Sequence, residues 1–259
     1  MRVAIMQPYF LPYIGYFQLI QAADRFVVYD NIQYTKKGWI NRNRILQNGK
    51  DEYISLPLKK DSDYLDVVQR SLADNFEQER DSALRKIKGL YHKAPQFQQV
   101  YPLLERIYDC PDHNLFRFIF HSIREVCAYL DIRTEMLVSS SLPIDHNLRS
   151  EDKVIAICKA THADAYLNPI GGTELYQPDR FRLHGFDLQF IKSTLVEYPQ
   201  FGKPFVPWLS ILDVMMFNSV EHIQQQLDTA YHIVRLPFRN PSLSFKESSG
   251  LQRLQVASL

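Results

Sequence analysis

The chain has 259 residues, of which 46% are hydrophobic and 23% charged, and its formal net charge is +1. This length and composition suit one large globular domain, and the near-neutral charge gives the whole molecule no electrostatic attraction to nucleic acid or to an anionic membrane surface. Because the sequence has no apolar run long enough to span a bilayer and no signal-peptide pattern, we expect a cytoplasmic protein without a membrane span.

The amino-terminal part of the chain predicts a βαβ unit. Residues 2–6 (RVAIM) and 25–30 (RFVVYD) are apolar strands, and residues 14–23 between them form a helix. A crossover of this kind joins parallel strands. Residues 31–50 are polar, basic and rich in aromatic side chains, which predicts a loop or irregular strand, and residues 52–58 predict a further strand.

The pattern changes to helical between residues 75 and 131. Apolar side chains recur at helical spacing on one face of the segment 113–132, namely at Leu115, Phe116, Ile119, Phe120, Ile123, Val126, Cys127 and Leu130. Pro95 and Pro102 interrupt the part before it. We therefore expect a helical insert between two parts of the sheet.

The second half of the chain returns to alternating strands and helices. Three strands are expected at 133–139, 164–170 and 186–191, and two helices at 151–162 and 207–219. This alternation predicts an α/β fold, a Rossmann-like parallel sheet with the helical insert and a C-terminal helical region. We expect one domain over residues 1–233, followed by a polar, serine-rich tail over 234–259 that is mobile.

The turn after the first strand has an unusual composition, MQPYFLPYIGYFQLI, over residues 6–20. In open parallel sheets, ligands bind beyond the carboxyl ends of the strands. Gln7 offers a donor and an acceptor, Tyr9 and Tyr16 offer flat rings with hydroxyl tips, and Gly15 permits close approach. These features indicate a ligand cradle. A hydrophobic lid over the sheet, with the tyrosines as ordinary core, uses the same side chains and remains open.

A second candidate segment, DNIQYTKKGWINRNR, covers residues 30–44. Arg42 is suited to binding a phosphate or carboxylate group in a bidentate manner, and aromatic residues beside it are suited to stacking on a ring. The candidates of this segment are Gln33, Tyr34, Trp39, Asn41, Arg42 and Asn43. A solvated basic hairpin is the structural alternative, and a nucleic-acid grip is disfavoured because the rest of the chain supplies no basic stripe.

Several other residues are candidates from their positions. Gly171 and Gly172 follow a strand in the same way as the first turn, so they are candidates for the other side of a cleft. Asp30 ends a parallel strand, which makes it the preferred catalytic carboxylate. Asp213 lies in an apolar helix, where it either pairs with an arginine or lysine or faces the cleft as a base.

Metal and nucleophile motifs give little support to other chemistry. The three cysteines, Cys110, Cys127 and Cys158, include no CxxC pair, which argues against a structural zinc site. Cys158 and His162 share a helix face, but spacing supplies no third ligand, so no metal site is predicted. The HExxH, P-loop, GxSxG and GxGxxG motifs are absent.

The motifs quoted above, with YHKAP and YPQFGKPFVPWLSILDVMMFNS, resemble the WbqC-like protein family over most of the chain to about residue 220. The matching positions are Gln7, Pro8, Tyr9, Pro12, Gly15, Tyr16, Asp30, Gln33, Tyr34, Trp39, Asn41, Arg42, Asn43, Gly171, Gly172, Ser210, Asp213 and Asn218. Where the family pattern has a glycine shortly after Asn218, this chain has SVEHI. Members occur in bacterial O-antigen and other surface-polysaccharide biosynthesis clusters, so the resemblance implies a cytosolic step on an activated sugar or a related acceptor.

The layout of the first turn is also similar to the strand–HxGH–helix opening of nucleotidylyltransferases. Tyr13 and Tyr16 stand where those enzymes have histidines, and neither carries a positive charge, which disfavours nucleotidyl transfer.

The leading hypothesis is a group-transfer enzyme, a transferase of surface-polysaccharide biosynthesis that acts on a nucleotide-activated sugar or amino-group acceptor, with acyl or aminoacyl transfer the favoured reaction. The alternatives are a non-catalytic binding or scaffold protein of the same pathway, and a nucleotidyltransferase-like or nucleic-acid-modifying protein. No cofactor is expected, and the expected partner is a phosphorylated small molecule. The proposed site residues are, for catalysis, Asp30 and Asp213 and, for substrate binding, Gln7, Tyr9, Gly15, Tyr16, Gln33, Tyr34, Trp39, Asn41, Arg42, Asn43, Gly171 and Gly172.

Overall fold

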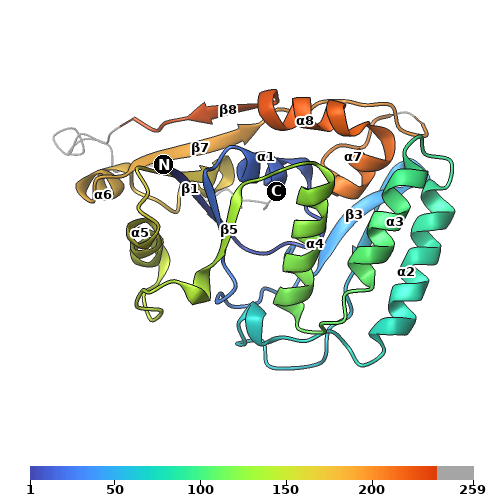
Figure 1. Cartoon of the computed structure of the whole chain (residues 1–259), viewed down its shortest axis with the longest axis horizontal. Coiled ribbons are helices and arrows are strands. Elements are labelled where there is room, and N and C mark those ends of the chain that lie inside the picture. Colours follow the sequence, from blue (N-terminus) through green and yellow to red (C-terminus); the bar gives the residue numbers. More distant parts are fainter. Residues whose placement is uncertain (203, 238–259) are drawn as a thin grey trace, which may run out of the picture.

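A six-stranded, mostly parallel sheet forms the centre of the molecule, as the computed structural model shows for residues 1–202 and 204–237 (Figure 1). Its strands are β1 (Arg2–Met6), β2 (Arg25–Val28), β5 (Glu135–Val138), β6 (Ala165–Pro169), β7 (Asp187–Ser193) and β8 (Tyr231–Val234). Across the sheet they lie in the order β5-β2-β1-β6-β7-β8, and only β8 runs antiparallel. The predicted α/β class is confirmed.

The strand order reverses direction between β1 and β6. From β1 the chain first builds outward through β2 and β5, and then crosses back to build outward through β6 and β7. In open α/β sheets this switch point, at the edge where the strands end, is where ligands bind. We call the edge where the parallel strands end the carboxyl edge, and the opposite edge the amino edge.

Helices cover both faces of the sheet, and the side chains of β1 show how the two faces are filled. Ala4 belongs to the larger hydrophobic core, whereas Val3 and Ile5 belong to a second core, as expected for a strand with alternating side chains. The helices α1 (Ile14–Gln21) and α8 (Val220–Thr229) pack together, and α1 also contacts β6 and β7. The second core contains side chains of α5 (Ser150–Ala160) and α6 (Pro178–Leu183).

The expected helical stretch between residues 75 and 131 forms α2 (Phe76–Tyr91), α3 (Phe97–Tyr108) and α4 (Leu115–Tyr129), which lie to one side of the sheet (Figure 1). Pro102 does not interrupt its helix but lies inside α3. The backbone hydrogen bond lost at this proline is outweighed by the burial of the apolar face of α3, in which Val100, Leu103 and Leu104 are fully buried.

Other elements differ from the expectation. Part of the segment expected as a loop or irregular strand forms a regular strand, β3 (Arg42–Gln47), which pairs in a hairpin with β4 (Lys50–Ser55). The apolar helix expected from residue 207 begins later, as α7 (Ile211–Phe217), because the Ser210 hydroxyl caps it by accepting from the backbone N–H of Leu212. The short elements α6, α8 and β8 were not predicted. Of the expected tail, residues 238–259 lie outside the described part of the chain.

Within the described part of the chain, no helix is long and apolar enough to cross a membrane.

Candidate functional site

The amino-terminal hook, which we define as residues 7–16, meets the β3–β4 hairpin as a result of the fold. The Phe10 N–H donates to the carbonyl of Ile40 at 3.0 Å, and Asn43 Nδ2 donates to the carbonyl of Phe10 at 3.2 Å. The Ser210 hydroxyl ties the hook to the start of α7 by donating to the Leu11 carbonyl at 2.7 Å. The structure therefore brings together the two segments that the sequence singled out.

This contact is mostly packing. Phe10 and Leu11 are fully buried, and the Phe10 ring lies edge-on to Tyr108 in the larger core. Gln7 and Tyr9 are half-buried. A cavity of about 20 Å³ against Tyr13 has room for little more than one water molecule. The hook resembles a lid over the sheet more closely than an open cradle.

Tyr16 and Gly15, which were predicted to contact a ligand, contact other residues of the protein instead. The Tyr16 hydroxyl donates to the carbonyl of Gln7 at 2.8 Å, and its buried ring lies 5.7 Å from that of Tyr9. Burial raises the pKa of Tyr9 to about 12. At Gly15, a Cβ atom would lie 2.3 Å from the Tyr13 ring and 2.5 Å from the Ser193 hydroxyl. The glycine thus allows α1 to approach these side chains.

The polar groups of the hairpin are also largely engaged. Arg42 Nε donates to the Gly38 carbonyl at 3.0 Å, another guanidinium nitrogen donates to the Lys37 carbonyl, and the group lies 4.6 Å from the Tyr53 ring centre. Asn41 Oδ1 accepts from the Tyr34 hydroxyl, and Asn41 Nδ2 donates to the carbonyl of Leu56, the residue after β4, each at 2.9 Å. Arg42 and Asn41 therefore hold the hairpin in shape.

The remaining residues of this segment make internal contacts of the same kind. The buried Tyr34 ring lies 4.5 Å from the Arg70 guanidinium, and the Trp39 ring lies 5.4 Å from that of Arg44. Gln33 is exposed and donates to the carbonyl of Asp63 at 3.0 Å. The aromatic faces predicted to stack on a ligand are stacked on arginines of the same chain.

The glycine pair follows β6 in a short 3₁₀ turn, η3 (Ile170–Gly172). Gly171 is exposed and has open space where a side chain would be, whereas a Cβ on Gly172 would lie 2.0 Å from Asn168 Nδ2. Of these two glycines, only Gly171 is accessible to a ligand at this strand end.

Asp213 is fully buried in α7, and it pairs with no arginine or lysine among the described residues. Its carboxylate accepts from the hydroxyls of Tyr91 and Tyr198, each at 2.7 Å, and from Gln200 Nε2 at 2.9 Å. Burial raises the pKa of Asp213 above its usual range, against the opposing effect of these hydrogen bonds. The structure therefore shows neither an ion pair with arginine or lysine nor a carboxylate free to act as a base in a cleft. Neutral hydrogen-bond donors stand where a cation was expected, and they engage both carboxylate oxygens.

Asp30 lies at the carboxyl edge, just beyond β2, and is fully buried. Its two oxygens accept from the backbone N–H and the hydroxyl of Ser140, at 2.9 and 2.6 Å. Ser140 belongs to the turn η2 (Ser139–Ser141) after β5, and Ser139 donates to Asn31 Oδ1 at 2.7 Å. These bonds clamp together the ends of β2 and β5.

Sequence reasoning missed Lys153 in the first turn of α5. This lysine is 1% exposed, and its Nζ lies 5.0 Å from the Tyr29 ring centre and 3.4 Å from the carbonyl oxygen of His146. Burial, together with the nearby positive charge of Arg149, lowers the pKa of Lys153, and the carboxylates of Asp66 and Asp30 oppose this effect. The sequence contained a signal, because Lys153 shares a helix face with the apolar Ile157, one turn later.

The groups around Lys153 form a cluster, the carboxyl-edge cluster, made of Tyr29, Asp30, Asp66, Arg149 and Lys153. Burial raises the pKa of the Tyr29 hydroxyl to about 12, while the charge of Arg149 acts in the opposite direction. Arg149 is exposed and precedes the first turn of α5. The cluster combines an exposed guanidinium at a helix N-terminus with a buried amine and a buried carboxylate.

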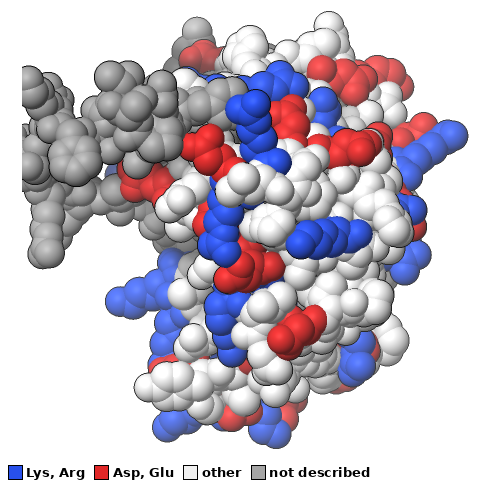
Figure 2. Space-filling view, turned by 90° about the vertical axis from the view of Figure 1, so that its left-hand side faces the viewer, with Lys and Arg blue, Asp and Glu red and all other residues white. Residues whose placement is uncertain are grey.

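The surface over α5 and α6 carries charges of both signs. On the face seen in Figure 2, Lys and Arg side chains alternate with Asp and Glu side chains and form no extended patch of one sign. Among these elements, Arg180 of α6 pairs with Glu151 of α5 at 3.1 Å and also with Asp152. This face gives no support to a nucleic-acid grip.

Cys158 and His162 do not form a reactive pair. Cys158 is fully buried, and burial raises its pKa to about 12, so the thiolate is disfavoured. Among the described residues, no three His, Cys, Asp or Glu side chains are grouped so as to hold a metal ion.

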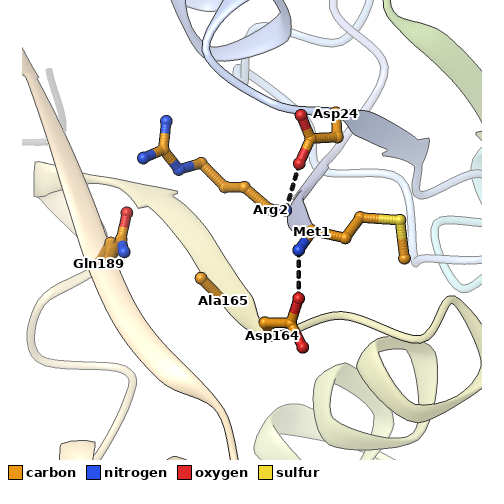
Figure 3. Close-up of a pocket in the computed structure, with 6 residues that line it drawn as sticks. All are labelled: Met1, Arg2, Asp24, Asp164, Ala165 and Gln189. Atoms are coloured by element: carbon orange, nitrogen blue, oxygen red, sulfur yellow. Dashed lines mark hydrogen bonds and ion pairs between the residues drawn. The ribbon is translucent and has the colours of Figure 1, made fainter.

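A larger cavity, of about 350 Å³, lies at the amino edge of the sheet (Figure 3). It is lined by Met1, Arg2, Asp24, Asp164, Ala165 and Gln189, none of which was a predicted site residue. The Met1 ammonium pairs with Asp164, and the Arg2 N–H donates to Asp24 at 2.6 Å. Because ligands of such sheets bind at the opposite edge, this cavity does not mark the predicted site.

Fold and site together define a doubly wound α/β protein with a polar cluster beside its topological switch point. The sequence profile of the WbqC-like protein family matches residues 7–225, so the chain belongs to that family. It is also 28% identical over 224 residues, 84% of this chain and 93% of the relative, to a protein of Mycobacterium tuberculosis (strain ATCC 25618 / H37Rv) named "Uncharacterized protein Rv1507c". No solved structure matched the chain.

Proposed function

We propose that this protein is a group-transfer enzyme of bacterial surface-polysaccharide biosynthesis that binds a nucleotide-activated sugar at the carboxyl edge of its sheet. Membership of the WbqC-like family supports the pathway, because members occur in O-antigen and related gene clusters. The observation that carries the proposal is the position of Arg149, an exposed guanidinium that forms no ion pair among the described residues, at the N-terminus of α5.

The charge balance around α5 supports a phosphate ligand. The acidic side chains of its first turn, Glu151 and Asp152, are both paired with Arg180. This leaves the positive charge of Arg149, together with the unpaired N–H groups of the helix start, available to an anion. A pyrophosphate is the anionic part of a nucleotide-activated sugar.

The neighbouring strand ends supply the other parts of the proposed site. Gly171 lies open at the end of β6, on the other side of the switch point from β2. Gln7, half-buried after β1, is assigned to the sugar or base. Asp30 is assigned as an orienting acceptor, because its Ser140 clamp already fixes its position.

Replacing Arg149 tests the proposal. We expect Arg149→Gln to weaken the binding of UDP-N-acetylglucosamine at least about tenfold in isothermal titration calorimetry, because a charge-assisted hydrogen bond is lost. The matched control is Arg133→Gln, which removes an exposed arginine just before β5, at the amino edge, and should leave the affinity unchanged. Equal affinities of the two variants, or no binding of UDP- or other nucleotide-linked sugars to the unmodified protein, would contradict it.

Turnover separates an enzyme from a non-catalytic binding protein. Nucleotide sugars that bind should be incubated with the protein and with acyl or amino-acid donors, and the products followed by mass spectrometry. A new product mass that requires Asp30 and Arg149 supports group transfer, whereas tight binding without any new mass favours the binding-protein alternative.

A further inference from the structure

Lys153 differs from every other lysine in the described part of the chain, because it alone is buried. Its amine forms no ion pair there, and its one hydrogen bond, to the carbonyl of His146, is long at 3.4 Å. Lysines are almost never fully buried unless they are paired. This amine therefore needs an explanation beyond packing.

Other buried charges in the same region are compensated. Glu151 accepts from the Gln177 N–H at 2.6 Å and pairs with Arg180, and Asp30 receives two hydrogen bonds from Ser140. An ammonium group offers three donors, and the surroundings of Lys153 give it one weak acceptor and an aromatic ring face. Burial and the charge of Arg149 lower the pKa of Lys153, against the opposing carboxylates of Asp66 and Asp30. The neutral amine, which has a free electron pair and is a nucleophile, is therefore easier to form here than at an exposed lysine.

The position of the amine also suits a reactive role. Lys153 lies in the first turn of α5 and faces Tyr29 at the end of β2, at the carboxyl edge. Arg149 lies one turn earlier and is exposed. The His146 carbonyl lies beside the amine, and the chain runs from there to Ser150, whose backbone is in the left-handed region, with φ at 48°. A ligand anchored on Arg149 would therefore have its reactive end close to this short segment and to the amine of Lys153.

We propose that Lys153 forms an imine with the carbonyl group of a phosphate-bearing aldehyde or ketone whose phosphate is bound by Arg149. This inference deepens the function proposed above, because it names a carbonyl-containing phosphorylated compound as the substrate class. The amine nitrogen attacks the carbonyl carbon, the carbon–oxygen bond breaks, and the oxygen leaves as water with both amine protons. The carbon–nitrogen double bond replaces the carbonyl bond, and no oxidant or reductant takes part.

Pyridoxal 5′-phosphate, which has both an aldehyde and a phosphate, is a suitable probe. The full chain is incubated with a low concentration of it, the imine is trapped with cyanoborohydride, and peptide mass spectrometry locates the label. We expect Lys153 to be labelled at least about tenfold faster than Lys159, an exposed lysine of the same helix, at a pH where most surface amines are protonated. Label confined to exposed lysines, with Lys153 unmodified, overturns the proposal.

Three variants sharpen the test. Lys153→Arg should abolish the fast label, whereas Lys159→Arg should not. Arg149→Gln should slow labelling by pyridoxal 5′-phosphate but not by pyridoxal, which lacks the phosphate, and equal slowing with both probes overturns the assigned role of Arg149. If Lys153→Arg fails to fold, the peptide map of the unmodified protein still decides the result.

The two proposals fail separately. If no nucleotide sugar binds in calorimetry, labelling of Lys153 by pyridoxal 5′-phosphate is still expected, because this probe contains no nucleotide. Conversely, an unreactive Lys153 leaves the calorimetric result at Arg149 unchanged.

Discussion

Asp213→Ala is expected to lower the free energy of unfolding by about 3 kcal/mol or more, measured by urea denaturation. The substitution removes the acceptor of three donors, the hydroxyls of Tyr91 and Tyr198 and the amide of Gln200, in a fully buried place. Each buried polar group left without a partner costs about 1–3 kcal/mol. Tyr91 also accepts from the Leu46 N–H at 2.7 Å, so the loss extends to the β3 strand.

Asp228→Ala is the matched control for this prediction. Asp228 lies exposed on α8, and it accepts a hydrogen bond from a glutamine amide, Gln21 Nε2, at 3.0 Å. Because water replaces that bond, the change in unfolding free energy should stay within about 0.5 kcal/mol. Similar losses in the two variants would show that the buried hydrogen bonds of Asp213 add nothing beyond a surface contact.

The pH dependence of stability gives a second measurement on Asp213. The pKa of its carboxyl is raised in the folded protein above the ordinary value of 3.8, so between these two values the folded state binds more protons than the unfolded state. The contribution of Asp213 to the free energy of unfolding is therefore fully present below the ordinary pKa and declines as the pH rises through the raised pKa. Accordingly, the stability advantage of the unmodified protein over Asp213→Ala should be largest at low pH, and an advantage that grows with pH would contradict the assigned direction.

The sheet could be predicted from the sequence because its strands are short apolar runs between recognisable turns. The strands predicted at residues 2–6 and 25–30 correspond closely to the observed bounds of β1 and β2. β3 was predicted only as a loop or irregular strand, because its sequence, RNRILQ, carries polar side chains that contact the hook and the segment before α7 instead of water. β8 is a short edge strand whose pairing with β7 depends on a contact distant in sequence.

The candidate site was harder to predict because rigid pocket walls and tight packing use the same residues. The prolines, glycine and tyrosines of the hook indicated a cradle, yet the neighbours of Gly15 and Phe10 are protein side chains. Arg42 looked free in the sequence, and only the fold shows that the carbonyls of Gly38 and Lys37 take up its guanidinium. Lys153 carried a local signal, a lysine one turn before an apolar helix residue, but its burial without an ion pair among the described residues is visible only in three dimensions.

The other large effect is expected at Gly15, where Gly15→Ala should lower the free energy of unfolding by about 1–3 kcal/mol. The new methyl group would lie 2.3 Å from Cε2 of Tyr13 and 2.5 Å from the Ser193 hydroxyl, so either the ring or α1 must move. The Tyr13 ring has little freedom to yield, because it lies edge-on to Trp208, with the ring centres 6.0 Å apart. The displacement would therefore reach Trp208 and Ser193, the last residue of β7.

Gly89→Ala separates this steric effect from the helix preference of alanine. Gly89 lies inside α2 with nothing within 4 Å of the position where a Cβ would stand. Alanine there should raise stability by about 0.5–1 kcal/mol, because glycine loses more backbone freedom on folding. Thermal and urea denaturation of both variants should therefore give shifts of opposite sign. A stabilising Gly15→Ala would mean that Tyr13 moves freely, and the hook would then have the flexibility of a ligand cradle that its packing argues against.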